Sequence, residues 1–454
     1  MSNNIFEKNV VNVHFVGVGG VSTSSLAEYL LLKGYKVSGS DVKRTERVNE
    51  LIQKGLNFKL GHHKRNILGA QVVVYTSAVN NRNPEIKYAI AKNIPLVKRS
   101  ELLGKIVSGY KNSVAISGCH GKTTATAMIA NVLTCANLNP TLFIGGEDGA
   151  LGSFRLGDSD YAVVEACEYK KNFLDVKAKY SLILNIDNDH LDTFIDMNDT
   201  IKAFSDFSEN SIAVINADDQ RCMKIYNPCT VTFGMENSAV YMAKNLKKNK
   251  CGYSFNAYSY SRLMGKINLK IIGKHNVYNA LATIAICDIM GLDFSVVKRA
   301  LESFSGVKRR AEYLGRIEGV SVFADYAHHP KEIKATLSAF SENFENIGVI
   351  FQPHTYSRTK YLMNDFVEEL KKYPNIIYST YPAREKYDEN GDAKKLYENL
   401  KKANKDTIYC ENTQELREKI LELSKKAQVV IVMGAGDIYD VFKEIVLQKK
   451  NQNK

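Results

Sequence analysis

Residues 112–133 read NSVAISGCHGKTTATAMIANVL: an apolar strand-like segment, a short turn and a helix-like segment. The turn ends as a phosphate-binding P-loop does, in GKT, but only two residues separate its glycines, whereas the familiar pattern has four. Such a turn directs backbone N–H groups and the positive end of a helix at phosphate oxygens. We therefore predict a shortened nucleotide-binding loop, formed by Gly118, Cys119, His120, Gly121, Lys122, Thr123 and Thr124.

Two residues of this loop have a defined chemistry in P-loops. Lys122 is expected to reach the β- and γ-phosphates of ATP, and the Thr123 hydroxyl is expected to ligate Mg²⁺. Magnesium takes few protein oxygens because it retains water. Acidic residues follow two later strand-like segments, since Glu165 ends DYAVVE and NIDNDH (185–190) follows the next one. Polar groups at strand ends predict metal or phosphate chemistry there.

Strand-like and helix-like segments alternate along nearly the whole chain. This alternation favours the α/β class, with doubly wound, mostly parallel sheets. The 454 residues correspond to about three domains at roughly 150 residues each. We place them at residues 1–107, 108–306 and 307–454, the first and last Rossmann-like and the central one binding ATP.

The composition excludes several classes of protein. The net charge is +12, but the lysines are scattered and no basic strip interleaved with aromatic residues is present, so we expect no nucleic-acid partner. No apolar run approaches the roughly 20 residues that span a membrane, and the N-terminus lacks a signal-peptide layout. We expect a cytoplasmic protein without membrane insertion, either a monomer or a homodimer. Among the eight cysteines, Cys135, Cys167 and Cys287 lie in apolar segments, which predicts buried thiols.

The segment that begins VVNVHFVGVGG (10–20) predicts a Rossmann-like βαβ unit. Its glycines, Gly17, Gly19 and Gly20, would let a phosphate approach the backbone, and Asp41 ends the next strand at a spacing that suits a ribose. A serine replaces the third glycine of the dinucleotide pattern, so a purely structural turn is the alternative. A nicotinamide dehydrogenase would explain this segment but not the P-loop. A later strand ends in TSA (76–78), small residues that suit a ligand crevice.

Two further segments carry hydrogen-bonding groups. KHNVYNA (274–280) opens a helix, where asparagines serve either as caps or as partners of a purine edge. DYAHHP (325–330) and FQPHTYSRT (351–359) both follow strand-like segments, and RTKYLMNDFVEELKK (358–372) predicts one helix.

These motifs together are similar to those of the Mur ligases. GCHGKTT, EACEYK, NIDNDH, KHNVYNA, GVKRR, DYAHHP, FQPHTYSRT and MGAGDI occur in the order seen in that family, after VGVGG and TSA. The resemblance spans essentially the whole chain, and the family's P-loop has the same short glycine spacing. It points to the members that join L-alanine to UDP-N-acetylmuramate.

The resemblance implies three domains, which bind the UDP-sugar, ATP and the amino acid in that order. It implies ATP and Mg²⁺ as cofactors and UDP-N-acetylmuramate and L-alanine as partners. ATP would phosphorylate the lactyl carboxylate to an acyl phosphate, which the amine of L-alanine would attack. A related ligase that attaches a whole peptide to UDP-N-acetylmuramate in cell-wall recycling is the alternative.

Residue roles follow from the same motifs. Thr123 and Glu165 would hold one Mg²⁺, and Glu165 with His190 the second. Catalytic roles are implied for Lys122, Glu165, His190, His328 and Arg358. The binding roles implied are adenine contacts by His275, Asn276 and Asn279, nucleotide contacts by Arg310 and Asp325, UDP-sugar contacts by Gly17, Gly19, Gly20, Asp41 and Ser77, and amino-acid contacts by Tyr326, His328 and Arg358.

The chain departs from the family pattern at Thr355, where many members carry a second arginine. That cation would pair with the amino-acid carboxylate. Its loss leaves more of the task to Arg358, so the identity of the amino acid is predicted from fewer residues than the ligase reaction.

Overall fold

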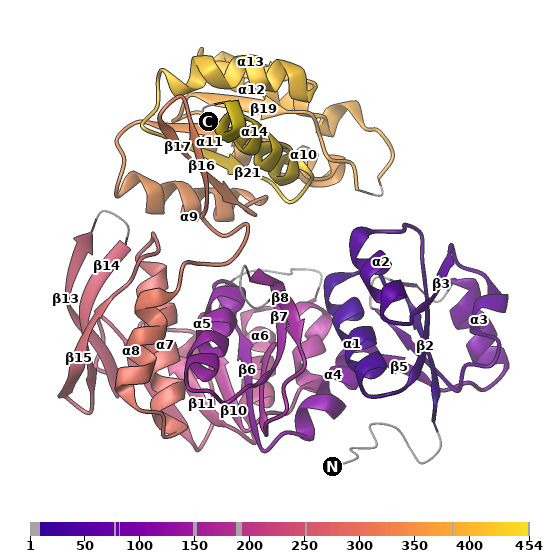
Figure 1. Cartoon of the computed structure of the whole chain (residues 1–454). Coiled ribbons are helices and arrows are strands. Elements are labelled where there is room, and N and C mark those ends of the chain that lie inside the picture. Colours follow the sequence, from indigo (N-terminus) through magenta and orange to yellow (C-terminus); the bar gives the residue numbers. More distant parts are fainter. Residues whose placement is uncertain are drawn as a thin grey trace. The chain divides into compact units, whose positions relative to one another are not determined.

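The computed structural model describes residues 10–76, 79–80, 82–148, 152–187, 193–249, 252–383 and 385–452 (Figure 1). Its contacts divide the chain into two compact units. The first unit runs to Phe304 without residues 248–253 and 270–274, and the second contains those two segments and the chain from Ser305 onward. No helix of the described residues is long and apolar enough to cross a membrane.

The N-terminal sheet has five parallel strands in the order β3-β2-β1-β4-β5. The predicted βαβ unit at the start of the chain is confirmed, because β1 and β2 pair in parallel on either side of α1. The elements of this part are β1 (Asn12–Val16), α1 (Val21–Leu32), β2 (Lys36–Asp41), α2 (Glu46–Gln53), β3 (Asn57–Leu60), the 3-10 helix η1 (Lys64–Ile67), β4 (Val72–Tyr75), α3 (Pro84–Ala91), β5 (Leu96–Lys98) and α4 (Arg99–Ser108).

The central sheet has ten strands in the order β15-β14-β13-β12-β11-β10-β6-β9-β7-β8. Its middle is parallel, and the β7–β8 and β14–β15 pairs are antiparallel. Its elements are β6 (Asn112–Ser117), α5 (Lys122–Cys135), β7 (Thr141–Asp148), β8 (Gly152–Arg155), β9 (Tyr161–Glu165), η2 (Tyr169–Asp175), β10 (Tyr180–Ile183), α6 (Met197–Ser208), β11 (Ile212–Asn216), η3 (Cys222–Lys224), β12 (Thr230–Gly234), β13 (Tyr241–Asn249), β14 (Gly252–Ser259), β15 (Arg262–Asn268), α7 (His275–Ile289) and α8 (Phe294–Ser303).

The C-terminal sheet has six strands in the order β16-β17-β21-β18-β19-β20, parallel except for the β16–β17 pair. The predicted α/β class with mostly parallel sheets is therefore confirmed. Its elements are β16 (Glu312–Ile317), β17 (Val320–Asp325), α9 (Pro330–Ser341), β18 (Ile347–Phe351), α10 (Tyr356–Tyr361), α11 (Met363–Leu370), β19 (Asn375–Tyr378), η4 (Glu389–Gly391), α12 (Ala393–Ala403), β20 (Thr407–Cys410), α13 (Thr413–Ser424), β21 (Val429–Met433) and α14 (Ile438–Gln452).

Two local predictions are wrong. The single helix expected over 358–372 is split into α10 and α11, because Leu362 leaves the helical conformation with φ −109° and ψ 20°. Cys287 is buried as expected, but Cys135 is exposed and Cys167 is only partly covered. Cys135 is the last residue of α5, where the chain turns out of the apolar layer.

Three aromatic rings join the N-terminal and central parts of the first unit. Tyr29 on α1 lies 5.9 Å from Phe143 and 6.3 Å from Phe154, which are 5.1 Å from each other on β7 and β8 (centroid distances). The Arg47 guanidinium also donates to Ser153 across the same boundary. Aromatic pairs at these separations stabilise beyond the area they bury. Both sheets consequently share one hydrophobic core.

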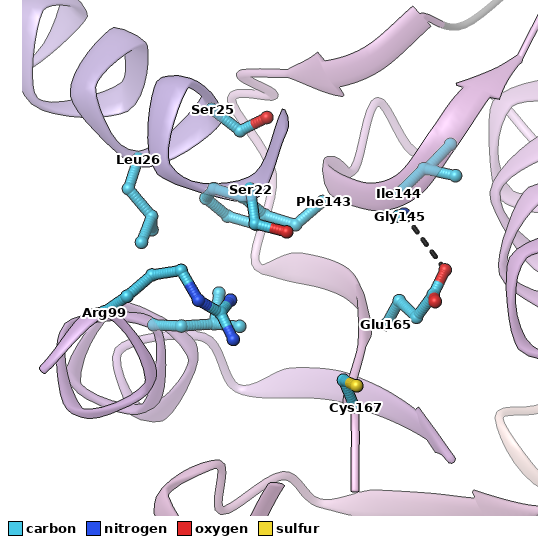
Figure 2. A pocket seen from close by; sticks show the side chains of 10 residues that line it. Ser22, Ser25, Leu26, Arg99, Phe143, Ile144, Gly145, Glu165 and Cys167 are labelled. Atoms are coloured by element: carbon cyan, nitrogen blue, oxygen red, sulfur yellow. Dashed lines mark hydrogen bonds between the residues drawn. The ribbon is translucent and has the colours of Figure 1, made fainter. Parts of the chain in front are cut away.

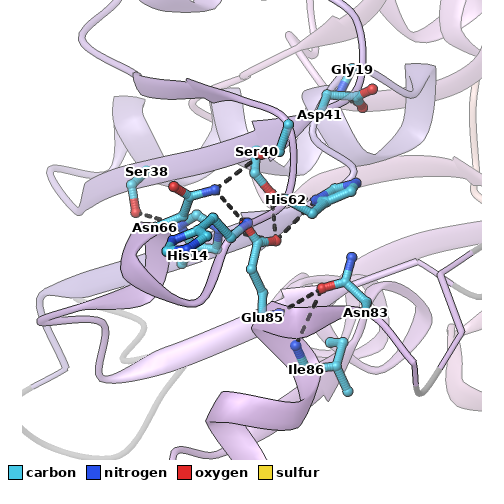
Figure 3. A network of polar contacts seen from close by, with 12 residues as sticks. His14, Gly19, Ser38, Ser40, Asp41, His62, Asn66, Asn83, Glu85 and Ile86 are labelled. Atoms are coloured by element: carbon cyan, nitrogen blue, oxygen red, sulfur yellow. Dashed lines mark hydrogen bonds and ion pairs between the residues drawn. The ribbon is translucent and has the colours of Figure 1, made fainter.

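A buried carboxylate organises the N-terminal sheet (Figure 3). Glu85, at the start of α3, is fully buried, and it accepts hydrogen bonds from Ser40 Oγ and Asn66 Nδ2, both at 2.6 Å, and from His62 Nδ1 at 3.1 Å. A buried charge is stabilised only when such donors replace its hydration. These donors come from three segments, so the carboxylate fixes their relative positions.

His14 lies beside this carboxylate inside β1. It is fully buried, with Nδ1 2.8 Å from Ser38 Oγ and Nε2 3.9 Å from the Glu85 carboxylate. Burial lowers the pKa of His14 to about 4, because the opposing effect of Glu85 is too small to offset it and His62 lowers the pKa further.

This pKa predicts a pH-dependent stability. The unfolded state takes up the proton near pH 6.5 and the folded state only near pH 4, so the free energy of unfolding should fall as pH falls through that interval. By pH 5 the loss is about 2 kcal/mol. Urea denaturation at pH 7 and pH 5, followed by circular dichroism, should show a smaller loss in His14→Asn than in the wild type.

His63→Asn, which removes an exposed histidine of the same domain, is the matched control and should keep the wild-type pH dependence. Equal losses in the wild type and His14→Asn would contradict the prediction.

Candidate active site

The predicted P-loop is the turn between β6 and α5. Gly118 and Gly121 have φ values of 130° and 85°, a region that glycine enters without steric cost. A Cβ on Gly118 would lie 3.0 Å from the Asn185 carbonyl oxygen, and one on Gly121 would lie 2.7 Å from Asn279 Oδ1. Both glycines are therefore required by the backbone conformation and by the space. The loop delivers the N-terminus of α5, whose first N–H groups have no partner within the helix.

The end of β10 holds this loop in place. The Asn185 carbonyl accepts from Cys119 N at 3.2 Å, and its side chain accepts from His120 N at 2.8 Å and donates to the His120 carbonyl at 3.0 Å. Cys119 Sγ additionally accepts from Asp187 N at 3.1 Å. Cys119 thus braces the loop through its backbone and thiol, and His120 braces it through its backbone.

Lys122 is the first residue of α5, and its ammonium lies across the loop. It donates to the Gly118 carbonyl at 2.5 Å and to Glu168 Oε1 at 3.0 Å. Burial alone would lower the pKa of Lys122, but the carboxylates of Glu168 and Glu165 outweigh burial and raise it above its usual value. The lysine is fully charged at neutral pH and faces the cradle where phosphate oxygens would lie.

Thr123 and Glu165 face each other beside the loop. The Thr123 hydroxyl donates to Glu165 Oε2 at 2.9 Å, and the same oxygen accepts from Gly145 N at 3.0 Å. A hydroxyl and a carboxylate are the oxygen donors that Mg²⁺ takes, and the ion needs only one or two protein ligands because it keeps its waters. This donor pair fits the predicted magnesium site. No cluster of three or more His, Cys, Asp or Glu suited to a metal occurs within the described ranges.

Two predicted residues lie outside the described residues. His190, the expected second metal ligand, falls in the gap between 187 and 193, and Ser77 falls in the gap between 76 and 79. Their roles stay predictions.

The predicted adenine segment begins α7 directly behind the P-loop. Asn276 and Asn279 are buried, and Asn279 Nδ2 donates to Asn276 Oδ1 at 3.0 Å, whereas His275 is exposed. Asn279 also bounds the space beside Gly121. This geometry favours the structural alternative for Asn279, and the adenine contacts stay a prediction.

The glycine turn of the N-terminal domain is closed by Asp41. Its carboxylate accepts from Gly19 N at 2.9 Å, and Gly17 N donates to the Ser40 carbonyl at 2.8 Å. Gly20 is the residue before α1. The turn therefore presents the start of a helix, as a phosphate site does. The Asp41 carboxylate supports that turn, and its contact with a ribose stays a prediction.

The second unit brings a separate set of predicted residues together. Ring contacts link Tyr326 to His328 (5.2 Å), His328 to His354 (5.7 Å) and His354 to Tyr381 (5.5 Å, stacked). The Arg358 guanidinium donates to His354 Nδ1 at 3.1 Å. One aromatic and basic cluster thus forms at the ends of β17 and β18.

Hydrogen bonding fixes the protonation of both histidines in the cluster. His328 Nδ1 faces two acceptors, the Tyr326 carbonyl at 3.0 Å and the Glu332 carboxylate at 3.2 Å, so Nδ1 carries the proton and Nε2 is the basic nitrogen. His354 Nδ1 accepts from Arg358 and is unprotonated. Burial lowers the pKa of His328, although the Glu332 carboxylate opposes the shift. Burial, together with the neighbouring His328 and Arg358, lowers the pKa of His354 to about 4. Both rings are neutral at pH 7, and Arg358 carries the positive charge between them.

Arg310 and Asp325 lie beside this cluster. The Arg310 guanidinium stacks over the Tyr326 ring at 5.4 Å, while Asp325 accepts from Ala311 N at 2.8 Å and Ala327 N at 2.9 Å. Burial raises the pKa of Asp325 although Arg310 opposes the shift. Asp325 closes the turn after β17, and its predicted contact with nucleotide is untested.

Sequence reasoning left three residues of these sites without a role: Glu168, Asn185 and His354. Each lies within a quoted motif, EACEYK, NIDNDH or FQPHTYSRT, directly after a strand. Their position directly after a strand was therefore the signal that could have identified them as site residues. Glu168 and Asn185 have partners that are distant in sequence, as for Lys122 and Glu168, which are 46 residues apart, whereas His354 contacts Arg358 four residues on. No local pattern reveals the distant pairs.

Family models match almost the entire chain. The "Mur ligase family, catalytic domain" matches residues 12–111, the "Mur ligase middle domain" matches 116–287, and the "Mur ligase, glutamate ligase domain" matches 309–436.

Individual proteins match over the same length. The UDP-N-acetylmuramate–L-alanine ligase of Acetivibrio thermocellus is 40% identical over 442 residues, covering 95% of this chain and 94% of that protein. The ligase of the same name from Clostridium tetani is 40% identical and covers 96% and 97%. The crystal structure of the UDP-N-acetylmuramate–alanine ligase of Thermotoga maritima superposes with a TM-score of 0.82 at 30% identity, covering 98% of this chain and all of that one.

A murein peptide ligase from Psychrobacter arcticus shares the fold, with a TM-score of 0.70 at 21% identity over 96% of this chain and 98% of that one. Three successive family matches, full-length relatives and the P-loop geometry agree. The chain belongs to the Mur ligase family and has its three-domain α/β fold.

Proposed function

We propose that this protein is an ATP-dependent ligase that joins L-alanine to the lactyl carboxylate of UDP-N-acetylmuramate, a step of peptidoglycan precursor synthesis. The observation that carries the proposal is 40% identity over 95% of the chain with a ligase named for this reaction. We also propose that the three domains meet between residues 107 and 108 and between residues 306 and 307.

In the first half-reaction, a carboxylate oxygen of the UDP-sugar attacks the γ-phosphorus of ATP, and ADP leaves. The product is an acyl phosphate, whose phosphate is a better leaving group than the original oxygen. Two anions must approach each other, so cations are needed between them. Lys122 neutralises the β- and γ-phosphates from within the loop. Mg²⁺, held by the Thr123 hydroxyl and the Glu165 carboxylate, would neutralise charge on the transferring group.

In the second half-reaction, the neutral amine of L-alanine attacks the acyl carbon and phosphate leaves from a tetrahedral intermediate. Arg358 would bind the amino-acid carboxylate through its guanidinium. The neutral His328, with its basic nitrogen on Nε2, can accept the proton that the ammonium must lose. Tyr326 limits the space for the side chain.

The decisive assay is phosphate release with ATP, Mg²⁺ and UDP-N-acetylmuramate, across single amino acids and an L-alanine-led tripeptide. Release that requires both the UDP-sugar and L-alanine supports the proposal. Phosphate release with the tripeptide alone would assign the protein to peptide recycling. No phosphate release with any acceptor would refute the ligase reaction.

Lys122→Ala should lower this phosphate release at least about a hundredfold, because one charge-stabilising donor is lost. It also leaves the buried carboxylate of Glu168 without its cation, which destabilises the fold. The double variant Lys122→Ala/Glu168→Gln should recover thermal stability and stay inactive. Lys111→Ala, which removes an exposed lysine of the same domain, should keep full activity.

Thr355→Arg should supply the second cation that the family pattern has at this position. Thr355 adjoins His354 and has φ 69°, so the backbone conformation is no worse for arginine than for threonine. We expect KM for L-alanine to fall about fivefold, as for about 1 kcal/mol from a partly exposed ion pair. Thr355→Gln adds a long uncharged side chain and should leave KM unchanged, so an equal effect of both variants would contradict a role for charge.

A further inference from the structure

A cavity lies within the first unit, between the N-terminal and central domains (Figure 2). Helices α1 and α4 form one wall, and the middle of β7 and the end of β9 form the other. It encloses about 50 Å³, well below the roughly 300–1,000 Å³ of a site that takes a whole ligand of drug size. The space suits one small group of a larger molecule. Its polar lining residues are Ser22, Ser25, Arg99, Glu165 and Cys167.

Arg99 places a positive charge in this cavity. It is the first residue of α4, and Figure 2 shows its side chain reaching from the helix into the space between Ser22 and Cys167, with Glu165 on the far side. Within the described part of the chain, its guanidinium makes no hydrogen bond and no ion pair closer than 4 Å. Burial lowers the pKa of Arg99, although Cys167, Asp175 and Glu165 oppose the shift.

Arg99 is partly buried, and a guanidinium withdrawn in part from water gains when an acceptor supplies the hydrogen bonds that its donors lack within the protein. Five N–H donors in a planar fork match a carboxylate, which accepts two parallel hydrogen bonds. The Arg99 side of the cavity therefore has the charge and the donor geometry to receive a carboxylate group.

The position of the cavity selects one carboxylate. Glu165, which lines the cavity, also contacts Thr123 of the P-loop at 2.9 Å, so the cavity opens beside the expected position of the γ-phosphate. The opposite wall is the first turn of α1, directly after the glycine turn of the UDP-sugar domain. A group reaching from that turn toward the phosphate passes Arg99.

We propose that Arg99 binds the lactyl carboxylate of UDP-N-acetylmuramate and holds it facing the γ-phosphate. This inference rests on the proposed function, since it names the residue that receives the reacting group. Arg99 neutralises the carboxylate as Lys122 neutralises the phosphate, so each anion has its own cation before they meet.

Calorimetric titration with two ligands tests the assignment. UDP-N-acetylglucosamine has the same nucleotide and sugar without the lactyl group, so it reports every contact except this one. Arg99→Gln should weaken UDP-N-acetylmuramate binding about 10- to 100-fold, the range for a hydrogen-bonded charged pair. Binding of UDP-N-acetylglucosamine should stay within about twofold. Arg99→Lys should give an intermediate loss of affinity for UDP-N-acetylmuramate, because the lysine ammonium keeps the charge but lacks the two parallel donors of the guanidinium.

Arg155→Gln is the matched control, since Arg155 is a half-buried arginine of the same unit that donates to Thr134 and does not line the cavity. It should leave both affinities unchanged. Arg99→Gln should keep a melting temperature close to that of the wild type, because no described residue depends on it for a hydrogen bond.

Each result that contradicts the proposal has a different explanation. An equal loss for both UDP-sugars would assign Arg99 to the diphosphate and overturn the proposal, and so would unchanged affinity for both. Loss of folding in Arg99→Gln with full affinity in Arg99→Lys would make the residue structural. A wild-type protein that binds both UDP-sugars equally and releases no phosphate would overturn the proposed function and this inference together.

Discussion

The central site depends on the conformation of a four-residue turn, Gly118 to Gly121. The two glycines let the chain turn back within this short distance, and the contacts of Asn185 with Cys119 and His120 hold the turn against the end of β10. This places the start of α5 where Lys122 and Thr123 face the ends of β9 and β10. A longer P-loop encloses phosphate with more backbone. Here the neighbouring strand supplies the support that the missing residues would give.

A second constraint comes from the packing of the N-terminal domain on the central one. Tyr29, Phe143 and Phe154 fix α1 beside β7 and β8, and α1 carries the glycine turn at its start. The distance between this glycine turn and the P-loop is consequently set by a hydrophobic contact within one compact unit. Chemistry that needs a sugar carboxylate and a phosphate to meet benefits from this rigidity, because orientation is settled before the substrates bind.

Much of the fold followed from the sequence, because strand and helix periodicity and glycine position are local signals. The strand–turn–helix around Lys122, the βαβ unit at the N-terminus and the start of α7 at His275 were all predicted from such signals. The break at Leu362 was missed, since the apolar pattern continues across it and nothing local marks the distortion. The exposure of Cys135 was not predicted, because the apolar composition of a segment does not show which of its residues lie at an exposed end.

The sites were less accessible from sequence than the fold. Lys122 and Thr123 are recognisable because they belong to one short motif. Arg99 sits in LVKRSELL, which has the appearance of an ordinary charged helix start, and only the packing of two domains turns it toward a cavity. Contacts such as that between Glu165 and Gly145 depend on strand order in the sheet, which residue patterns do not specify.

The ion pair between Lys122 and Glu168 has a consequence for ligand selection. Lys122 has a counter-ion within the protein, so an anion that binds at the loop must compete with a carboxylate that is covalently part of the chain. A weak monoanion such as chloride or acetate gains little from that exchange. A triphosphate offers several oxygens to the lysine and the loop at once, and its multivalency overcomes the competition. The Glu168 carboxylate therefore favours anions that make several contacts with the loop at once over small anions that make only one.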